Sequence, residues 1–247
     1  MVVEMRLILL LMIIPAVAAL DVTMTVSEFL DAQIIGLENK QMTDVVNTSF
    51  EIFNSGSIGS KSRIKIDVLN QGKQVARLWS HEFIFQPNDR EFIEFYWPLQ
   101  NRTGKFTISA KYYGSNEIKD LGNYSFQTKN QSNFNETIQI ISPKIYKDKI
   151  AFHVKPEKTT EAYVIPLRYP SGWIIEQTKS KIYQGKMNYI EVDMKPDVWN
   201  KGTIVLMVAD GNGNYGTSEF QIKRESFLNE AVFSTINFLE GIFSKFL

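Results

Sequence analysis

The stretch Arg63-Ile64-Lys65-Ile66-Asp67-Val68-Leu69-Asn70-Gln71-Gly72-Lys73 decides the fold class of this chain. Apolar and polar side chains alternate from Arg63 to Leu69, which is the period of a half-buried β-strand. Residues Asn70 to Lys73 are typical of a tight turn, and an apolar segment from Val75 to Trp79 follows them. This pattern predicts a β-hairpin.

Similar strand patterns occur on both sides of the hairpin, separated by residues that favour turns. They cover Ser49–Phe53, Phe83–Phe85, Phe92–Trp97, Phe106–Tyr113 and Tyr124–Thr128. About seven short strands at intervals of roughly 8 to 12 residues are typical of an antiparallel β-sandwich. We therefore expect one β-sandwich over residues 20–129.

A second series of strand patterns follows the polar stretch 130–137, which we interpret as a linker. The series covers Ile138–Ile141, Ile150–Val154, Ala162–Leu167, Trp173–Gln177, Asn188–Met194, Thr203–Ala209 and Ser218–Lys223. It predicts a second Ig-like β-sandwich over residues 138–224. The two halves show no sequence repeat, so they are expected to share an architecture and nothing closer.

From Ser226 the apolar residues recur with a period of about 3.6, which predicts an amphipathic helix over residues 226–247. The expected fold class is thus all-β, with two tandem antiparallel Ig-like β-sandwiches and a C-terminal amphipathic α-helix. Glu230, Asn237 and Glu240 argue against a membrane span, because polar side chains are costly in hydrocarbon. The helix is expected to dock on a membrane surface or a partner, or else to pack on its own sandwich. Its docking residues would be Leu228, Val232, Phe233, Ile236, Phe238, Leu239, Ile242, Phe243 and Phe246.

Residues 1–19 have the layout of a secretory signal peptide. A short charged start precedes the apolar run from Leu7 to Ile14, and Ala16-Val17-Ala18-Ala19 offers small side chains to a signal peptidase. The run is shorter than the about 20 residues that a membrane span needs. We expect cleavage after Ala18 or Ala19 and a mature protein outside the cytoplasmic membrane, at the cell surface or associated with a membrane. An uncleaved anchor is the alternative.

The composition excludes several classes of function. Lys plus Arg and Asp plus Glu number 27 each, and no basic stretch is interleaved with aromatics, so a nucleic-acid partner is not expected. The chain contains no cysteine, which excludes thiol nucleophiles, Cys-ligated zinc and iron–sulfur clusters. An exported protein without disulfides depends on its cores or on its partners for stability.

The first half carries turn motifs of a known family. These are Phe53-Asn54-Ser55-Gly56, Ile66-Asp67-Val68-Leu69-Asn70-Gln71-Gly72-Lys73, Phe85-Gln86-Pro87-Asn88-Asp89-Arg90-Glu91 before Ile93-Glu94-Phe95-Tyr96-Trp97, and Gly104-Lys105-Phe106-Thr107-Ile108. With them, residues 21 to 129 resemble the CARDB-type immunoglobulin-like domains of archaeal and bacterial surface proteins, including S-layer-associated ones. Asn88 departs from the glycine that the family usually has after the proline. The resemblance implies an adhesion or scaffold module and assigns no functional residue. The second half is only generically similar to Ig or fibronectin-type sandwiches.

The sequence lacks a catalytic signature, and neither a metal nor another cofactor is expected. Asp210-Gly211-Asn212-Gly213-Asn214 offers alternating oxygen ligands, but an EF-hand loop would need Gly at Tyr215 and Glu at Gln221. A tight turn is the alternative. His81 and His153 stand alone in different halves, and no Gly-x-Ser-x-Gly motif accompanies them.

Aromatic residues raise the possibility of a carbohydrate-binding surface. Most are expected in the cores, because alternating strands send about half of their side chains inward. Trp173 is the expected exception, since Pro170 and Gly172 place it in a turn. Asn-x-Ser/Thr sequons, which mark possible glycosylation sites, occur at Asn47, Asn101, Asn123, Asn130 and Asn135.

These features together predict an exported, non-enzymatic structural or adhesion protein of the cell envelope. It would act by docking to envelope or surface proteins, as an S-layer or surface-complex accessory. The alternatives are a carbohydrate-binding module, which would show a row of exposed aromatics on one sheet face, and an accessory domain of a secreted hydrolase.

Overall fold

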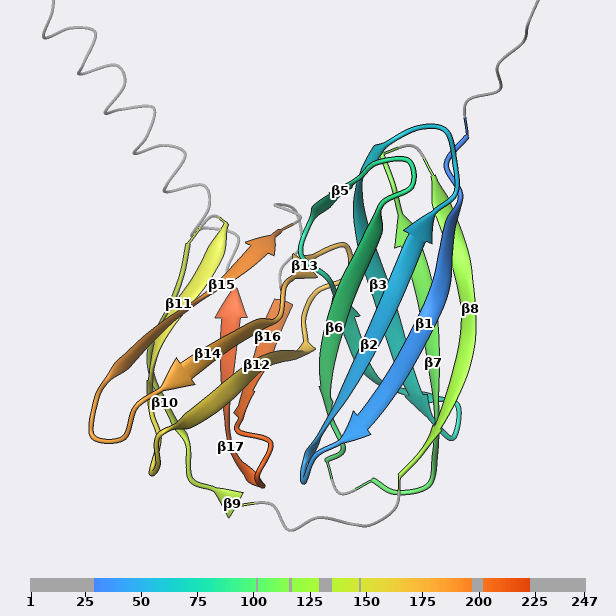
Figure 1. Cartoon of the computed structure of the whole chain (residues 1–247). Coiled ribbons are helices and arrows are strands. Elements are labelled where there is room, and N and C mark those ends of the chain that lie inside the picture. Colours follow the sequence, from blue (N-terminus) through green and yellow to red (C-terminus); the bar gives the residue numbers. More distant parts are fainter. Residues whose placement is uncertain are drawn as a thin grey trace, which may run out of the picture.

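The structure is a computed structural model that describes residues 29–100, 102–115, 117–128, 135–146, 148–196 and 202–222. Within these ranges the chain forms strands and turns and contains no helix. A helix able to cross a membrane is accordingly not found in the described part of the chain. The strands build two β-sandwiches that lie side by side (Figure 1).

The first sandwich consists of two antiparallel sheets. One has the strand order β1-β2-β6 and the other the order β4-β3-β7-β8, with β5 pairing with β3. The strands are β1 (Ala32–Gln41), β2 (Val45–Asn54), β3 (Ser60–Asn70), β4 (Lys73–Trp79), β5 (Phe83–Phe85), β6 (Arg90–Pro98), β7 (Lys105–Tyr113) and β8 (Ile118–Gln127).

The second sandwich also has two sheets, with the orders β10-β11-β15-β13 and β14-β12-β16-β17-β9. All pairs are antiparallel except β17 with β9, which run parallel. The strands are β9 (Asn135–Glu136), β10 (Gln139–Ile145), β11 (Lys149–Lys155), β12 (Thr160–Arg168), β13 (Ile174–Ile175), β14 (Thr178–Ile182), β15 (Asn188–Lys195), β16 (Gly202–Ala209) and β17 (Asn214–Ile222).

The predicted hairpin is confirmed as β3 and β4. Its two-residue turn places Gln71 at φ 51° and Gly72 at φ 78°, so both central residues are in the left-handed region. Such a turn matches the right-handed twist of the two strands. Side chains alternate between buried and outward positions along β7, as its sequence pattern predicts.

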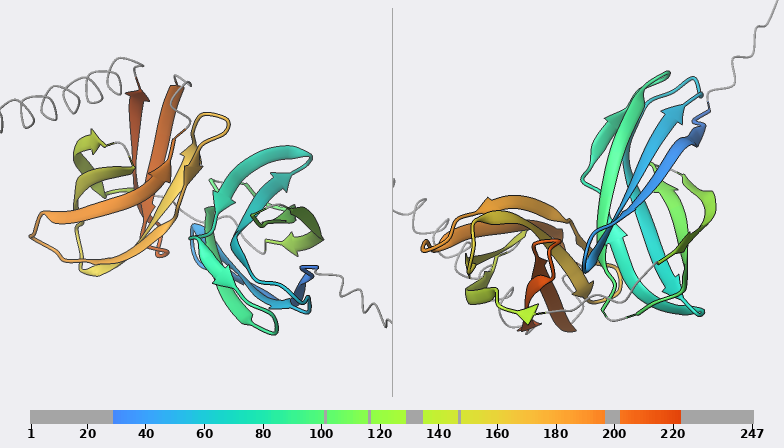
Figure 2. Two further views of the ribbon diagram at one scale, coloured as in Figure 1. Left: turned by 90° about the horizontal axis from the view of Figure 1, so that it is seen from above. Right: turned by 60° about the horizontal axis from the view of Figure 1, so that its bottom comes forward.

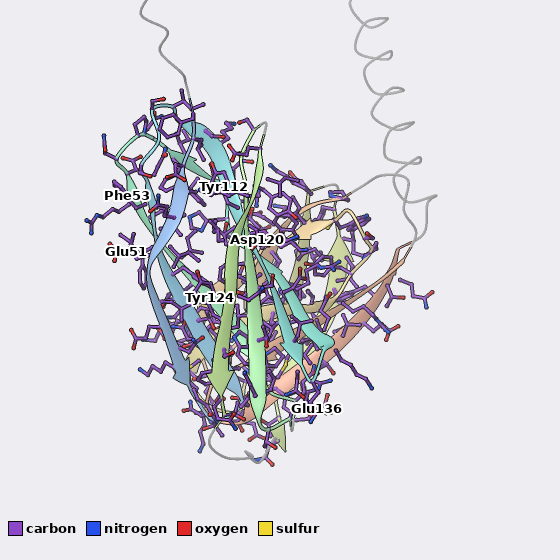
Figure 3. The ribbon with its side chains drawn as sticks, turned by 90° about the vertical axis from the view of Figure 1, so that its right-hand side faces the viewer. Glu51, Phe53, Tyr112, Asp120, Tyr124 and Glu136 are labelled. Carbon is purple, nitrogen blue, oxygen red and sulfur yellow. The ribbon has the colours of Figure 1, made fainter. Side chains whose placement is uncertain are left out.

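The core of the first sandwich is centred on Trp97, which is completely buried. The Trp97 ring lies 4.9 Å from the Phe106 ring and 6.0 Å from the Phe126 ring, measured between centroids. Its Nε1 donates a hydrogen bond of 2.9 Å to Thr48 Oγ1, so the polar atom of the indole is satisfied inside the core. Figure 3 shows this sandwich from the side, with Tyr124 labelled. The Tyr124 and Phe50 rings lie 6.1 Å apart between centroids.

The fold class expected from the sequence is corrected in one respect. The all-β class is confirmed, but the described chain is made of strands and turns, so the C-terminal amphipathic helix is not part of the observed architecture. Its predicted docking residues, Leu228 to Phe246, lie outside the described residues, as does the signal peptide at residues 1–19. Periodicity alone had favoured a helix there, whereas most of the stability of a helix in a protein comes from tertiary packing, which periodicity does not show.

The predicted linker lies partly outside the described residues. Residues 130–134 are not described, whereas Asn135 and Glu136 form β9 and pair with Asn214 and Tyr215 of β17. The polar composition of the segment did not indicate this pairing, because it depends on backbone hydrogen bonds such as Asn135 N to Gly213 O at 2.8 Å.

We expect Trp97→Ala to lower the free energy of unfolding by about 3–5 kcal/mol, because it leaves a cavity in the core. Urea denaturation measures the loss. Phe92→Ala on the same strand is the matched control: Phe92 is 62% exposed, so its loss should stay within about 0.5 kcal/mol. Similar losses in the two variants would contradict this account of the core.

Candidate functional site

The second sandwich contacts the first mainly through β12, and we call this contact region the junction. β12 contacts β4 and β6, and the two sandwiches meet along these strands (Figures 1 and 2). The apolar cluster of the first sandwich continues across the junction into residues of β12 and β16: Tyr163, Ile165, Met207 and Ala209. The two sandwiches therefore share buried apolar surface, which favours their association.

Gln177 completes the free edge of β6. Tyr96 N donates to Gln177 Oε1 at 2.9 Å, and Gln177 Nε2 donates to the carbonyl oxygen of Tyr96. β6 is the last strand of its sheet, so these backbone groups have no strand partner on that side. The side-chain amide takes the place of a neighbouring strand and satisfies both groups.

An ion pair lies beside this contact. Arg63 Nη1 is 2.5 Å from Glu176 Oε1 and also donates to Ser80 O at 3.0 Å. The Arg63 side chain is only 9% exposed. Tyr169 adds a further link, because its hydroxyl donates to Arg77 O at 2.9 Å, and burial raises the pKa of this hydroxyl. These contacts fix the orientation of the second sandwich more than they stabilise it.

Two tyrosines stack across the junction. The rings of Tyr96 and Tyr163 lie 4.2 Å apart at an angle of 25°. The Tyr96 hydroxyl donates to Glu94 Oε2 at 2.9 Å, and Lys179 Nζ lies 5.7 Å from the Tyr163 ring. Burial, followed by the hydrogen bond to Glu94, raises the pKa of Tyr96, and burial also raises the pKa of Tyr163.

A buried carboxyl group marks the end of the junction. Asp44 lies in the turn between β1 and β2 and is completely buried. Its Oδ1 accepts a hydrogen bond from Gly213 N at 3.3 Å, while Oδ2 has no hydrogen-bond partner among the described residues. Burial, with a smaller effect from the nearby Asp210 charge, raises the pKa of Asp44 to about 6.

The loop that faces Asp44 consists of residues 210–214 and forms a tight turn. A tight turn was the alternative to a calcium-binding loop for this segment. Asp210 Oδ1 accepts hydrogen bonds from Asn212 N at 2.8 Å and Asn214 N at 3.1 Å, and Oδ2 accepts one from Asn214 Nδ2 at 2.8 Å. Gly211 and Gly213 have φ values of 71° and 100°, which residues with a Cβ rarely adopt. The Asp210 carboxylate therefore orders the turn by accepting N–H groups. Among the described residues no group of three or more His, Asp or Glu side chains could hold a metal ion.

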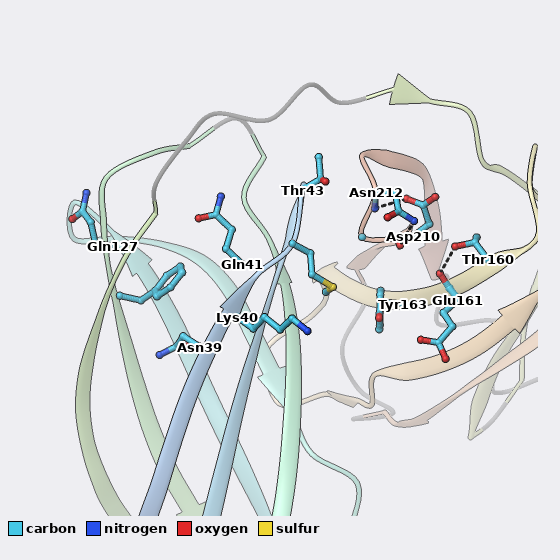
Figure 4. Close-up of a pocket in the computed structure, with 13 residues that line it drawn as sticks. Asn39, Lys40, Gln41, Thr43, Gln127, Thr160, Glu161, Tyr163, Asp210 and Asn212 are labelled. Atoms are coloured by element: carbon cyan, nitrogen blue, oxygen red, sulfur yellow. Dashed lines mark hydrogen bonds between the residues drawn. The ribbon is translucent and has the colours of Figure 1, made fainter.

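A cleft of about 1000 Å³ opens beside Asp210, with walls from both sandwiches (Figure 4). The first sandwich contributes Asn39, Lys40, Gln41, Met42, Thr43, Phe126 and Gln127, and the second contributes Thr160, Glu161, Tyr163, Asp210, Gly211 and Asn212. Amide and hydroxyl groups dominate this lining, with one aromatic ring on each side. These amide and hydroxyl groups can form hydrogen bonds with a ligand in the cleft.

The structure corrects the prediction for Trp173. Its side chain is 1% exposed and belongs to the apolar core of the second sandwich. Trp173 N donates to Pro170 O at 3.3 Å, so the predicted turn is present. The prediction is wrong because turn residues locate a bend in the backbone but do not decide on which side of it the indole packs.

Three of the five sequon asparagines lie in the described chain. Asn123 on β8 and Asn135 on β9 are exposed. Asn47 is half-buried on β2, and its Nδ2 donates to Glu94 Oε1 at 2.8 Å. Asn101 and Asn130 lie outside the described residues. Glycosylation of these sites stays a prediction.

The sequence analysis missed the polar residues of the junction and of the cleft. The predicted strand Trp173–Gln177 is observed only in part, as β13 at Ile174–Ile175, and the polar pair Glu176-Gln177 directly after it was not recognised as a contact. Two polar residues at the end of an apolar strand were the available signal. Their partners, Arg63 and Tyr96, are too far away in the sequence to be inferred from local patterns.

Comparisons with known proteins give likenesses of structure only. No family model matches the chain, and no curated protein matches it. A CARDB domain from Pyrococcus furiosus is 16% identical and covers 41% of this chain and 96% of its own, with a TM-score of 0.30. β-Glucosidase 3B from Thermotoga neapolitana is 12% identical over 40% of this chain and 17% of its own, with a TM-score of 0.28. The chicken interferon gamma receptor alpha chain is 9% identical over 79% of this chain and 98% of its own, with a TM-score of 0.26. At these TM-scores the likenesses carry no argument about what this chain binds or does.

We expect the wild type to become less stable as the pH rises through the pKa of Asp44, and we expect Asp44→Asn to abolish this change. Because the pKa of Asp44 is about 6 in the folded protein and 3.8 ordinarily, its contribution is complete below pH 3.8 and is lost as the pH rises through about 6. A shift of this size corresponds to about 3 kcal/mol at most. Asparagine keeps the acceptor for Gly213 N and carries no charge.

Urea denaturation at a series of pH values measures this effect. Asp31→Asn is the control, because the hydrogen bond from Lys119 holds the pKa of Asp31 near 2. Asp31 therefore acts in the acid range, where its contribution is lost as the pH falls, and its variant should keep the loss near pH 6. A pH profile of Asp44→Asn that parallels the wild type would refute the assignment.

Proposed function

We propose that this chain is an exported, non-catalytic protein of the cell envelope that docks a surface protein in the cleft between its two sandwiches. The observation that carries the proposal is the fixed junction. Gln177 holds β6, Arg63 pairs with Glu176, and Tyr96 stacks on Tyr163, so both walls of the cleft keep one geometry. A binding site whose walls are already in place costs less entropy when a partner binds.

The chemistry of the cleft supports a protein partner. Amide and hydroxyl side chains form hydrogen bonds with a polypeptide backbone and with polar side chains, and tyrosine adds contact area at a low cost in entropy. Lys40, Glu161 and Asp210 are the charged residues of the lining, and the Asp210 carboxylate is already hydrogen-bonded within its own turn, so the lining does not select a strongly charged ligand. The signal-peptide layout of residues 1–19 supports a location outside the cytoplasmic membrane.

We expect Thr43→Trp to weaken docking by at least about tenfold, because the indole fills part of the cleft. The measurement is the binding of the labelled chain, without residues 1–19, to envelope preparations of the source organism. Thr217→Trp is the matched control, since Thr217 is exposed on β17 and does not line the cleft. Unchanged binding by Thr43→Trp would exclude the cleft, and no binding by the wild type would exclude docking to the envelope.

The fixed junction has its own test. Gln177→Ala leaves the backbone groups of Tyr96 without their partner, which costs about 1–3 kcal/mol at the junction. Small-angle X-ray scattering should then show a larger radius of gyration, because the sandwiches separate part of the time. Gln139→Ala, on an exposed residue of β10, serves as the control and should leave the scattering curve unchanged. A compact Gln177→Ala variant would show that the apolar contacts alone hold the angle.

A further inference from the structure

Exposed aromatic side chains gather on the outer face of the sheet formed by β10, β11 and β15. β10 and β11 lie on the side of the second sandwich that is remote from the first (Figure 1). Tyr189 is 55% exposed and Tyr146 is 38% exposed, and His153 lies between buried and exposed. We call these three residues, with Lys149 and Glu191, the aromatic platform.

The strand register brings the members of the platform together. His153 on β11 is opposite both Ile141 on β10 and Tyr189 on β15, so these three side chains form a row across the sheet. The rings of His153 and Tyr189 lie 5.4 Å apart between centroids. Tyr146 follows directly after β10, and Lys149 Nζ lies 5.8 Å from its ring.

A hydrogen-bond network holds the platform in place although it is exposed. Glu191 Oε1 accepts hydrogen bonds from the Tyr189 hydroxyl at 2.6 Å and from Lys149 Nζ at 2.7 Å. The same hydrogen bonds, with that from Lys149 first, lower the pKa of Glu191, which remains a carboxylate acceptor. Since the Tyr189 ring is already oriented, a ligand that stacks on it loses little further entropy.

The junction contains a similar tyrosine–glutamate pair whose tyrosine ring is covered by another ring. Tyr96 also donates its hydroxyl to a glutamate two residues away on its strand, Glu94, and its face is covered by the flat ring of Tyr163 at 4.2 Å. Tyr189 likewise donates its hydroxyl to a glutamate two residues away, Glu191, but Tyr189 is 55% exposed. By this analogy the oriented face of Tyr189 suits a ligand that stacks on the ring.

We propose that the aromatic platform binds a pyranose ring of a surface glycan. The C–H groups on one face of a sugar ring stack on the electron-rich face of Tyr189, beside the tilted His153 ring. The hydroxyl groups at the rim of the sugar donate to Glu191 and accept from Lys149, which together present one acceptor and one donor. The two charges neutralise each other, which matches a neutral polyhydroxylated ligand rather than a charged one.

The test is isothermal titration of the chain without residues 1–19 against cellohexaose, laminarihexaose, mannohexaose and chitohexaose. At least one should bind, and Tyr189→Ala should weaken its binding by at least about tenfold. Tyr183→Ala is the matched control. Tyr183 is 45% exposed, and Lys181 and Lys186 lie 5.8 and 5.5 Å from its ring, but it belongs to the turn between β14 and β15 and not to the platform. This control should change the dissociation constant by less than about twofold.

The possible outcomes separate this proposal from protein docking in the cleft. Glycan binding that survives in Thr43→Trp and fails in Tyr189→Ala supports the platform whether or not the cleft docks a protein. Failure of all four oligosaccharides to bind, or equal losses in Tyr189→Ala and Tyr183→Ala, overturns the proposal. A wild type that self-associates, in contrast to a monomeric Tyr189→Ala, also overturns it, because the face would then join copies of the chain.

Discussion

The contact between the free edge of β6 and the segment Glu176-Gln177 orients the two described sandwiches relative to each other. Successive side chains of an extended segment point to opposite sides. Glu176 therefore reaches Arg63 on β3, whereas Gln177 reaches Tyr96 on β6, and these two strands belong to different sheets of the first sandwich. One dipeptide of the second sandwich thus binds both sheets of the first, which fixes rotation as well as distance.

Apolar and polar contacts have different roles at this junction. Tyr163, Ile165 and Met207 bury apolar surface against the first sandwich, and this burial supplies most of the favourable free energy. Arg63 is buried with its Nε atom lacking a hydrogen-bond partner among the described residues, so its ion pair offsets a cost more than it stabilises. The polar contacts select one angle among the several that apolar packing would allow. In a chain without cysteine, such selection depends on side-chain hydrogen bonds.

The sequence predicted the local features well and the distant contacts poorly. The alternation in Arg63–Leu69 and the turn at Gln71-Gly72 are local signals, and the structure confirms the hairpin that they predict. The junction was not predictable, because Arg63 and Glu176 are 113 residues apart and Asp44 and Gly213 are 169 residues apart. The predicted exposure of Trp173 was wrong for a related reason. The turn at Trp173 is a local feature, but the core that buries its ring is assembled from distant strands.

Comparison of Tyr96 with Tyr189 connects the fold to its surfaces. Each tyrosine donates its hydroxyl to a glutamate two positions away on its own strand, and this hydrogen bond helps to orient the ring. At Tyr96 the ring meets Tyr163, and the local device becomes part of an interface within the chain. At Tyr189 the same device is exposed on the outer face of a sheet. The oriented ring of Tyr189 is more than half exposed and therefore contributes little to the stability of the fold. Its exposed face can instead contribute to the binding of a second molecule.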